Sequence, residues 1–267
     1  MPEPTGNRMT LHPIPAFNDN YIWALADDLG RCVLVDPGQA APALEFVQQQ
    51  QLALAAILIT HHHYDHIGGV AELLAQHPAP VYGHPWDTGP AVITPQEDQE
   101  FAIDNFALRF RLLAIPGHTD NHVAFYWPGD TQQAPILFSG DTLFAGGCGR
   151  LFGLPPELMF NSLAKLQQLP AATRVCCAHE YTLSNLAFAR HWLPEDQALL
   201  ARQQQVQALR DKGLPSVPST LAEELATNPF LRTSDVALQQ ALCNATGQPL
   251  QTPLATFTLL RELKDSF

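Results

Sequence analysis

The chain has 267 residues, more than one domain usually needs and a comfortable length for two, so it can bury a core without disulfide staples. Hydrophobic residues make up 46% of it and charged residues only 15%, below the roughly 25% typical of globular proteins, which excludes long disordered charged tails. With 14 Lys+Arg against 26 Asp+Glu the formal net charge is -12, which disfavours nucleic acid and anionic membrane surfaces as partners.

Short β-rich runs alternate with a few helical stretches up to about residue 180, as in a domain built from layers of sheet and helix. After a loose lead-in before Met9, strands are predicted at 21–26, 32–35, 56–59, 80–82, 108–114, 122–126, 136–138 and 174–177. Helices are predicted at 41–51, 70–76 and 156–168. The last of these begins at Pro155-Pro156, which suits a first helical turn.

The composition changes after about Glu180, where the β-branched runs disappear. Helices are predicted there at 183–192, 194–212, 219–226, 234–244 and 253–264. Gly213-Leu214-Pro215 lies between the helices predicted at 194–212 and 219–226, and Gly247-Gln248-Pro249 lies between those at 234–244 and 253–264. We therefore predict two domains, residues 1–179 and a helical domain of residues 180–267.

The five cysteines indicate a reducing compartment, because their number is odd and Cys176 and Cys177 are adjacent. We expect these thiols to be buried or inert rather than catalytic. The first residues lack the apolar run of a signal peptide, and no window approaches the 18 apolar residues of a membrane span. The expectation is a cytoplasmic protein without a membrane partner.

Histidine is abundant in this charge-poor chain, with 11 residues, and imidazole is the commonest metal ligand. Several lie in the run Thr60-His61-His62-His63-Tyr64-Asp65-His66, which Gly68-Gly69 follows. His61 and His63 are alternate residues that can project to one side, while Asp65 and His66 emerge further round the turn. Since these four side chains cannot all point one way on a regular strand or helix, they imply a turn around a metal. A solvated surface cluster is the alternative, which the Asp and the glycine pair at these offsets disfavour.

Three further segments put a potential ligand directly after an apolar strand: His118, Asp141 and His179. Active sites of layered α/β proteins gather at the carboxyl edges of strands. A single His or Asp after a strand is more often a cap or a satisfied hydrogen-bonding residue. Together with the His-rich turn, however, the three predict a metal site.

The pattern Thr-His-x-His-x-Asp-His-x-Gly-Gly, followed by a later His, an Asp and a final His, resembles the metallo-β-lactamase superfamily. Other segments are similar to the glyoxalase II, or hydroxyacylglutathione hydrolase, family: Pro15–Ile22, Val35–Gly38, Gly140–Phe144, Gly147–Arg150, His179–Thr182 and Asn228–Arg232. The resemblance implies an α+β fold, a four-layer αββα sandwich followed by a helical C-terminal domain that binds substrate.

The resemblance also implies two divalent metal ions. Zinc is the first expectation and iron or manganese the alternatives, because His and carboxylate ligands accept all three metals. His61, His63 and His118 would hold one ion. Asp65, His66 and His179 would hold the other, with Asp141 bridging both. The implied reaction is hydrolysis of S-(2-hydroxyacyl)glutathione, typically S-D-lactoylglutathione, by a metal-bridging hydroxide, which is the second step of methylglyoxal detoxification. Because a thiolate leaves readily, no dedicated general acid is needed, though Asp65 could shuttle a proton.

Contacts to the small-molecule substrate are implied for Arg150, Phe152, Tyr181 and Arg232. Two departures from the family affect this part of the site. Phe152 stands where the family often has Tyr, and no basic residue follows Arg232 in Thr233-Ser234-Asp235. Another thiol in place of glutathione therefore stays open, as does the oligomeric state.

Other functions within and outside the superfamily fit the sequence less well. A persulfide dioxygenase uses a single iron, so the second set of ligands argues against it. Lactonase and β-lactamase activity share the metal chemistry and differ only in the pocket. A silent metal-binding scaffold is opposed by the complete ligand set, and a nucleic-acid-processing relative by the acidic charge. Among the remaining residues, Asp36 is expected to be a buried hydrogen-bonding support, and His122 either supports a ligand ring or makes a strand-entry hydrogen bond.

Overall fold

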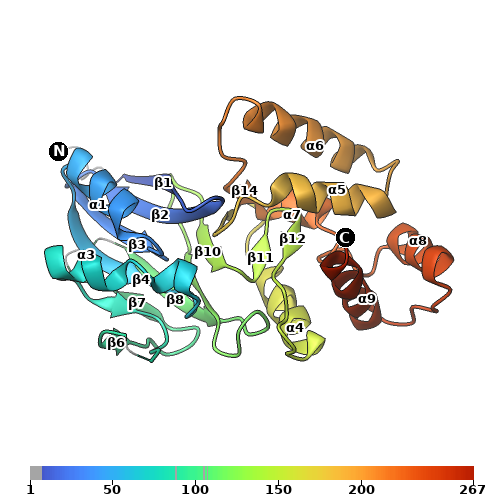
Figure 1. Cartoon of the computed structure of the whole chain (residues 1–267), viewed down its shortest axis with the longest axis horizontal. Helices are drawn as coiled ribbons and strands as arrows, with labels where there is room; N and C mark the ends of the chain where they lie inside the picture. The colour runs from blue at the N-terminus through green and yellow to red at the C-terminus, as the bar shows by residue number, and fades with distance from the viewer. Residues whose placement is uncertain (1–7, 88, 105, 107) are drawn as a thin grey trace. The chain divides into compact units, whose positions relative to one another are not determined.

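The computed structural model describes residues 8–87, 89–104, 106 and 108–267. The chain divides into two compact units, residues 1–114 with 121–140 and residues 115–120 with 141–267. Each unit is described by itself below, with the elements labelled as in Figure 1. The predicted lead-in before Met9 lies outside the described residues, apart from Arg8.

The first unit contains a mixed sheet in the order β1-β2-β3-β4-β5-β6. Its antiparallel part is β1 (Met9–Ala16), β2 (Asn20–Asp27) and β3 (Arg31–Val35), and its parallel part continues from β3 through β4 (Ala53–Leu58), β5 (Val81–Tyr82) and β6 (Val92–Ile93). Helices α1 (Ala40–Gln49) and α3 (Val70–Gln76) supply Val47, Val70 and Leu73 to a core with the sheet. Burial of these apolar side chains holds the sheet edge that carries the His-rich turn.

Four antiparallel strands form a second layer of the first unit, in the order β10-β9-β8-β7. They are β7 (Glu100–Ala102), β8 (Arg109–Ala114), β9 (Val123–Trp127) and β10 (Ile136–Gly140). Phe110, Phe125 and Phe138 are almost completely buried on these strands. The chain leaves this unit after β8 and again after β10, and His118 and Asp141 follow those two points.

The second unit is mainly helical (Figure 1). Its strands form two antiparallel pairs, β11 (Leu143–Phe144) with β12 (Gly147–Cys148) and β13 (Arg174–Cys177) with β14 (Ser219–Thr220). Its helices are α4 (Pro156–Leu166), α5 (Thr182–Trp192), α6 (Gln197–Arg210), α7 (Leu221–Thr227), α8 (Val236–Thr246) and α9 (Pro253–Asp265). Side-chain caps explain several starts, since Asp196, Asp235 and Thr252 each accept from backbone N–H groups of the following turn.

Most predicted elements are confirmed, with ends displaced by at most about three residues. The sequence missed β1, whose Pro13 and Pro15 lower its strand signal but are tolerated on an edge strand. The single helix predicted over 219–226 was wrong at its start, because Ser219 and Thr220 pair with β13 and Thr220 then caps α7. Among the described residues, none of the helices has the length and apolar content of a membrane span.

Candidate metal centre

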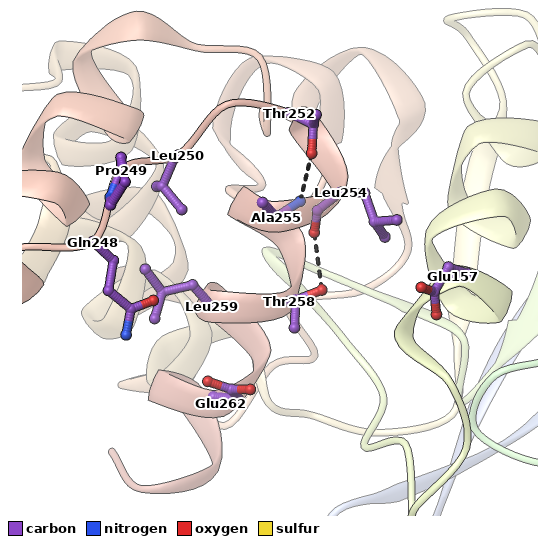
Figure 2. Close-up of a pocket in the computed structure, with 10 residues that line it drawn as sticks. All are labelled: Glu157, Gln248, Pro249, Leu250, Thr252, Leu254, Ala255, Thr258, Leu259 and Glu262. Carbon is purple, nitrogen blue, oxygen red and sulfur yellow. Dashed lines mark hydrogen bonds between the residues drawn. The ribbon is translucent and has the colours of Figure 1, made fainter.

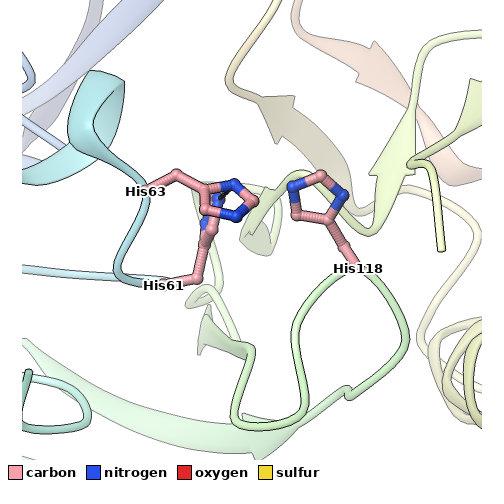
Figure 3. Close-up of side chains that lie close together, drawn as sticks. All are labelled: His61, His63 and His118. Atoms are coloured by element: carbon pink, nitrogen blue, oxygen red, sulfur yellow. Dashed lines mark hydrogen bonds between the residues drawn. The ribbon is translucent and has the colours of Figure 1, made fainter. Parts of the chain in front are cut away.

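The His-rich turn follows β4 and leads into α2 (Tyr64–Ile67), a single helical turn that carries Asp65 and His66. The side chains of His61 and His66 are buried, with relative exposures of 3% and 1%. Nε2 of His61 lies 3.1 Å from Nδ1 of His63, and Figure 3 shows the two rings close together. The turn therefore presents imidazole nitrogens toward a common point, as the alternate spacing of the two residues predicts.

Asp36 is the centre of a buried network behind this turn. Its Oδ1 accepts from the backbone N–H of Thr60 at 2.8 Å, and its Oδ2 accepts from the Thr60 hydroxyl at 2.7 Å and from Nδ1 of His66 at 3.0 Å. Because the Thr60 hydroxyl gives its hydrogen to Asp36, it can only accept from Nδ1 of His61, 3.1 Å away. Both imidazoles thus carry their proton on Nδ1, which leaves Nε2 as the ligand atom.

The positions of Asp65 and its neighbours are held by two further contacts. Nδ2 of Asn20 donates to Oδ2 of Asp65 at 3.0 Å, and the same oxygen lies 3.6 Å from Nε2 of His66. The backbone of Asp65 also lies close to Gly38, where a side chain would not fit, because a Cβ there would lie 1.8 Å from the backbone oxygen of Asp65. The sequence did not predict Asn20, for which the only signal was its place in the Pro15–Ile22 segment.

His122 is completely buried, and its ring is stacked on the ring of His61. The ring centroids lie 4.6 Å apart with an interplanar angle of 21°. The contact limits rotation of the His61 ring, whose Nδ1 also faces the Thr60 hydroxyl. The structure thus shows His122 packed against a candidate ligand, and the two predicted hydrogen-bonding roles stay predictions.

The second unit contributes His118, Asp141 and His179, all at most 6% exposed. They follow β8, β10 and β13 respectively, and Figure 3 shows His118 on its loop. Oδ2 of Asp141 lies 3.4 Å from Nε2 of His118 and 3.4 Å from Nε2 of His179. One carboxylate oxygen therefore faces two imidazole nitrogens.

Backbone and aromatic groups orient the two imidazoles of this unit. Nδ1 of His118 donates to the backbone carbonyl oxygen of Arg150 at 2.9 Å. The ring of His179 is stacked on Tyr181, with centroids 4.7 Å apart and an interplanar angle of 6°. Gly149 lets the backbone lie close to that of Asp141, since a Cβ at position 149 would lie 2.0 Å from the backbone oxygen of Asp141.

The separations between these donor atoms fit ligands of a shared ion. Two ligand atoms at 2.0–2.1 Å from a tetrahedral zinc ion lie about 3.3 Å from each other. Four pairs of these atoms within the units, His61–His63, Asp65–His66, Asp141–His118 and Asp141–His179, are 3.1–3.6 Å apart. The carboxylate–imidazole distances among them are longer than those of a good hydrogen bond. All the predicted ligands belong to groups of His and Asp that could hold a metal ion. The clusters fit a dinuclear metal site.

Three of the predicted substrate residues lie beside ligand side chains of the second unit. The side chain of Arg150 is 66% exposed, with Nε 3.7 Å from Oδ1 of Asp265. Phe152 is 68% exposed, and its ring centroid lies 5.2 Å from that of His118. Tyr181 is 37% exposed, and one face of its ring is stacked on His179. An exposed cation and two exposed aromatic rings thus accompany this ligand set.

Arg232 has partners that differ from those the resemblance implies. Its guanidinium donates to Oδ2 of Asp196 at 2.7 Å and to Oδ2 of Asp235 at 2.5 Å. These carboxylates cap α6 and α8, so one arginine links two helix N-termini. Partial burial opposes ionisation of both acids, but the hydrogen bonds from Arg232 and from backbone N–H groups outweigh it and lower the pKa of each.

The four buried cysteines are poor candidates for a nucleophile. Cys32, Cys148, Cys176 and Cys177 are buried thiols. Burial raises the pKa of Cys32 and of Cys177 to about 12 and that of Cys148 to about 11. Thiolate is scarce at neutral pH under these conditions, which agrees with the prediction of inert thiols.

A separate cavity of about 390 Å³ lies in the second unit beside α9 and the start of α4 (Figure 2). Its charged lining residues are Glu157 and Glu262, both exposed. The hydroxyl of Thr258 donates to Leu254, and that of Thr252 accepts from Ala255. Because these polar atoms are already used within α9, the cavity offers no convergent set of ligands.

Two family models cover nearly all of the chain. The model of the metallo-beta-lactamase superfamily matches residues 17–179, and the model of the hydroxyacylglutathione hydrolase C-terminus matches residues 180–267. Curated hydroxyacylglutathione hydrolases are similar over almost their whole length. The protein of Hahella chejuensis is 47% identical over 96% of this chain and 98% of its own. That of Alkalilimnicola ehrlichii is 50% identical over 94% and 97%, and that of Yersinia pestis 46% over 97% and 100%.

Solved structures of the same fold are more distant in sequence. The BLEG-1 B3 metallo-beta-lactamase has a TM-score of 0.59 at 25% identity, covering 84% of this chain and 99% of its own. TTHA1623 in a di-iron-bound form has a TM-score of 0.59 at 29% identity, covering 82% and 100%. ETHE1 from Myxococcus xanthus has a TM-score of 0.61 at 21% identity, covering 98% and 99%, a likeness of fold alone.

Proposed function

The chain belongs to the hydroxyacylglutathione hydrolase family of the metallo-β-lactamase superfamily, and from this premise we propose that it hydrolyses the thioester of S-(2-hydroxyacyl)glutathione. The products would be glutathione and a 2-hydroxy acid, with S-D-lactoylglutathione and D-lactate as the typical pair of the second step of methylglyoxal detoxification. The observation that carries the proposal is the near full-length similarity to curated enzymes of that name, which includes the helical C-terminal segment.

The proposed metal ligands are the seven His and Asp side chains described above. His61, His63 and His118 would hold one divalent ion, and Asp65, His66 and His179 the other, with Asp141 between them. The position of Asp141 Oδ2 at 3.4 Å from both His118 and His179 supports a bridging role. Zinc is our first choice, with iron and manganese as alternatives. Residues 1–179 would form the metal-binding domain and residues 180–267 the substrate-binding domain.

When bound, two divalent ions supply a water activated at neutral pH and polarise the thioester carbonyl. The chain's own residues prepare the site for this chemistry. Asp36 and the Arg150 carbonyl hold the Nδ1 protons of His66 and His118, which fixes the ring orientation of each. Oδ2 of Asp65, which Asn20 orients, is placed to take and pass on a proton. The leaving thiolate, with a pKa near 8.5, needs no dedicated acid.

Recognition of glutathione requires cations, because the tripeptide carries two carboxylates and the chain itself has a net charge of -12. We assign this role first to Arg150, whose exposure supports it. Phe152 and Tyr181 would pack against the acyl or peptide part of the substrate. Arg232 would contribute chiefly by fixing the N-termini of α6 and α8, since two carboxylates already share its guanidinium.

The nearer rival functions are lactone or β-lactam hydrolysis and persulfide oxidation within the same fold. The helical C-terminal match favours thioester hydrolysis over all three. The buried reduced thiols support a reducing compartment, so we propose a cytoplasmic location.

The test is turnover of S-D-lactoylglutathione by the purified full chain loaded with zinc, followed by loss of thioester absorbance. We expect turnover, and two metal ions per chain by elemental analysis. Arg150→Ala should raise KM about fivefold with a smaller change in kcat, because an exposed charge pair is worth roughly 1 kcal/mol. A preparation that hydrolyses a lactone or a β-lactam but not the thioester would overturn the proposal.

A further inference from the structure

The hairpin of β11 and β12 connects two proposed parts of the metal site. It begins two residues after Asp141 and ends two residues before Arg150, whose carbonyl accepts the Nδ1 proton of His118. The hairpin is almost completely buried, so its backbone polar groups must find partners inside the protein. Those partners come from helices far along the chain.

Glu224 on α7 reaches the hairpin with its carboxylate, and its side chain is fully buried. Its Oε2 accepts from the backbone N–H of Gly146 at 2.7 Å, at the tip of the hairpin. Its Oε1 is paired with Arg202 of α6, which also donates to the hydroxyl of Thr227 at 2.5 Å. The arginine balances the buried charge and fixes which oxygen turns toward the hairpin.

Asparagine side chains hold the hairpin carbonyls. Nδ2 of Asn228 donates to the carbonyls of Phe144 and Gly147, at 3.2 and 2.9 Å, and to Oε2 of Glu224 at 3.1 Å. Nδ2 of Asn185 on α5 donates to the carbonyl of Ala145 at 3.1 Å. Figure 1 shows the hairpin next to α5 and α7, the helices that carry or precede these residues. These contacts fix both strands of the hairpin and its turn.

Arg261 on α9 holds the chain where the hairpin ends. It is 4% exposed, and its guanidinium donates to the carbonyls of Cys148 and Gly149 at 2.8 and 3.4 Å. The N–H of Gly149 donates in turn to the carbonyl of Thr142 at 3.2 Å, which closes the segment beside Asp141. The backbone from Thr142 to Gly149 is therefore set by side chains of the helical region.

We propose that Glu224 is a positioning residue for the metal site, acting through the β11–β12 hairpin on Asp141 and on the Arg150 carbonyl. The inference rests on the proposed function, because it takes Asp141 and His118 as metal ligands. It gives the C-terminal helices a second task besides substrate binding. Without the Glu224 carboxylate the Gly146 N–H loses its acceptor and Arg202 is left as an uncompensated buried charge, so the hairpin must move or open to water.

The test compares two variants. Each lacks a buried carboxylate that accepts hydrogen bonds from an arginine side chain and from backbone N–H at a turn. Glu224→Ala affects the hairpin. Asp27→Ala is the matched control, since Asp27 accepts from Arg31 at 2.7 Å and from the N–H groups of Leu29 and Arg31, within the β2–β3 turn. The readouts are zinc affinity by competition with a chromophoric chelator, the cobalt absorption spectrum, and hydrogen exchange of peptides covering residues 141–150.

We expect Glu224→Ala to weaken zinc affinity at least tenfold, the range found when a residue that hydrogen-bonds to a metal ligand is lost. The cobalt absorption spectrum should change, and hydrogen exchange over residues 143–149 should become faster. Asp27→Ala should change zinc affinity less than twofold. The double variant Glu224→Gln/Arg202→Met keeps an acceptor for Gly146 without a buried charge, and should return affinity to within about threefold of the original chain.

Failure of this inference differs from failure of the proposed function. An unaltered chain that binds two zinc ions and hydrolyses the thioester, while Glu224→Ala has the same zinc affinity and spectrum as the Asp27→Ala control, would overturn the inference alone. An unaltered chain that binds no zinc would overturn the proposed function and the inference with it. If Glu224→Ala does not fold, the double variant Glu224→Gln/Arg202→Met decides. Slow hydrogen exchange over residues 143–149 together with weakened zinc affinity in the double variant would contradict the proposal, because the hairpin would be intact while the metal site is not.

Discussion

The proposed metal ligands of the two units are oriented by different means. In the first unit, Asp36 and Thr60 bind the imidazoles directly through side-chain oxygens. In the second unit, the carbonyl of Arg150 and the ring of Tyr181 perform this function, and the loop behind them is held by helix side chains as far as 113 residues away. The first set depends on a compact polar network at one sheet edge, and the second depends on the fold of the helical region.

This difference predicts how each set responds to damage. A defect in the first network should act mainly on single imidazoles, because its side-chain oxygens contact the Nδ1 atoms of His61 and His66 directly. A defect in the second should move a whole segment, because its supports bind backbone groups between Asp141 and Arg150. Metal affinity should therefore fall in both cases, whereas local opening of the segment between Asp141 and Arg150 should increase only in the second.

Asp141→Asn should give the largest loss. The oxygen that faces both His118 and His179 becomes part of a neutral amide, and a shared anion is what offsets repulsion between two ions in one site. We expect kcat/KM to fall about 1000-fold or more, corresponding to several kcal/mol of lost stabilisation, with fewer than two zinc ions retained. Steady-state kinetics and elemental analysis measure this. Asp120→Asn, at an exposed carboxylate two residues after His118, should be nearly neutral, and equal losses in both variants would contradict the bridging role.

Asp36→Asn should weaken the first ligand set by an intermediate amount. The amide can still occupy the position, but it accepts the Nδ1 proton of His66 less strongly than a carboxylate does. Zinc affinity should fall 10–100-fold, as for other outer partners of ligands. Hydrogen exchange over residues 141–150 should stay unchanged, in contrast to Glu224→Ala. Faster exchange in that segment would show that the two supports are not separate.

The residues proposed as the first ligand set are easier to find in the sequence than the groups that support them. His61, His63, Asp65 and His66 lie within six residues, so the turn is visible in a single motif, and the metallo-β-lactamase fold with its helical C-terminal segment is confirmed by the family models. The contacts of Glu224 and Arg261 with the hairpin were not predictable, because they join residues 78 and 113 positions apart through the tertiary fold. No spacing rule connects a buried glutamate with a glycine N–H that far away.

Arg232 illustrates the same limit, because its motif indicates substrate contact while its contacts indicate a link between two helix caps. Arg232→Ala should lower the free energy of unfolding by about 1–2 kcal/mol at pH 7 and change KM less than Arg150→Ala does. Both Asp196 and Asp235 have pKa values lowered from 3.8. Their contribution to the free energy of unfolding is therefore complete above that pH and is lost as the pH falls through the lowered pKa values. Urea unfolding at pH 7 and at pH 3 should show a smaller difference between variant and original chain at pH 3. A rise in KM equal to that of Arg150→Ala, with unchanged unfolding, would identify Arg232 as a substrate contact.

Thiol labelling gives the smallest and most local readout. Cys243 is part-exposed, whereas Cys32 in the first unit and Cys148 in β12 are buried, with pKa values raised by burial to about 12 and about 11. At pH 8 we expect one rapidly reacting thiol per folded chain, at Cys243, measured with a chromogenic disulfide reagent and peptide mass analysis. Glu224→Ala should add Cys148 to the labelled set without changing Cys32, because the loss frees the hairpin and leaves the β3 strand intact. Labelling of Cys32 at the same increased rate would mean that the variant opens both units, and that support from the helices is not specific to the second ligand set.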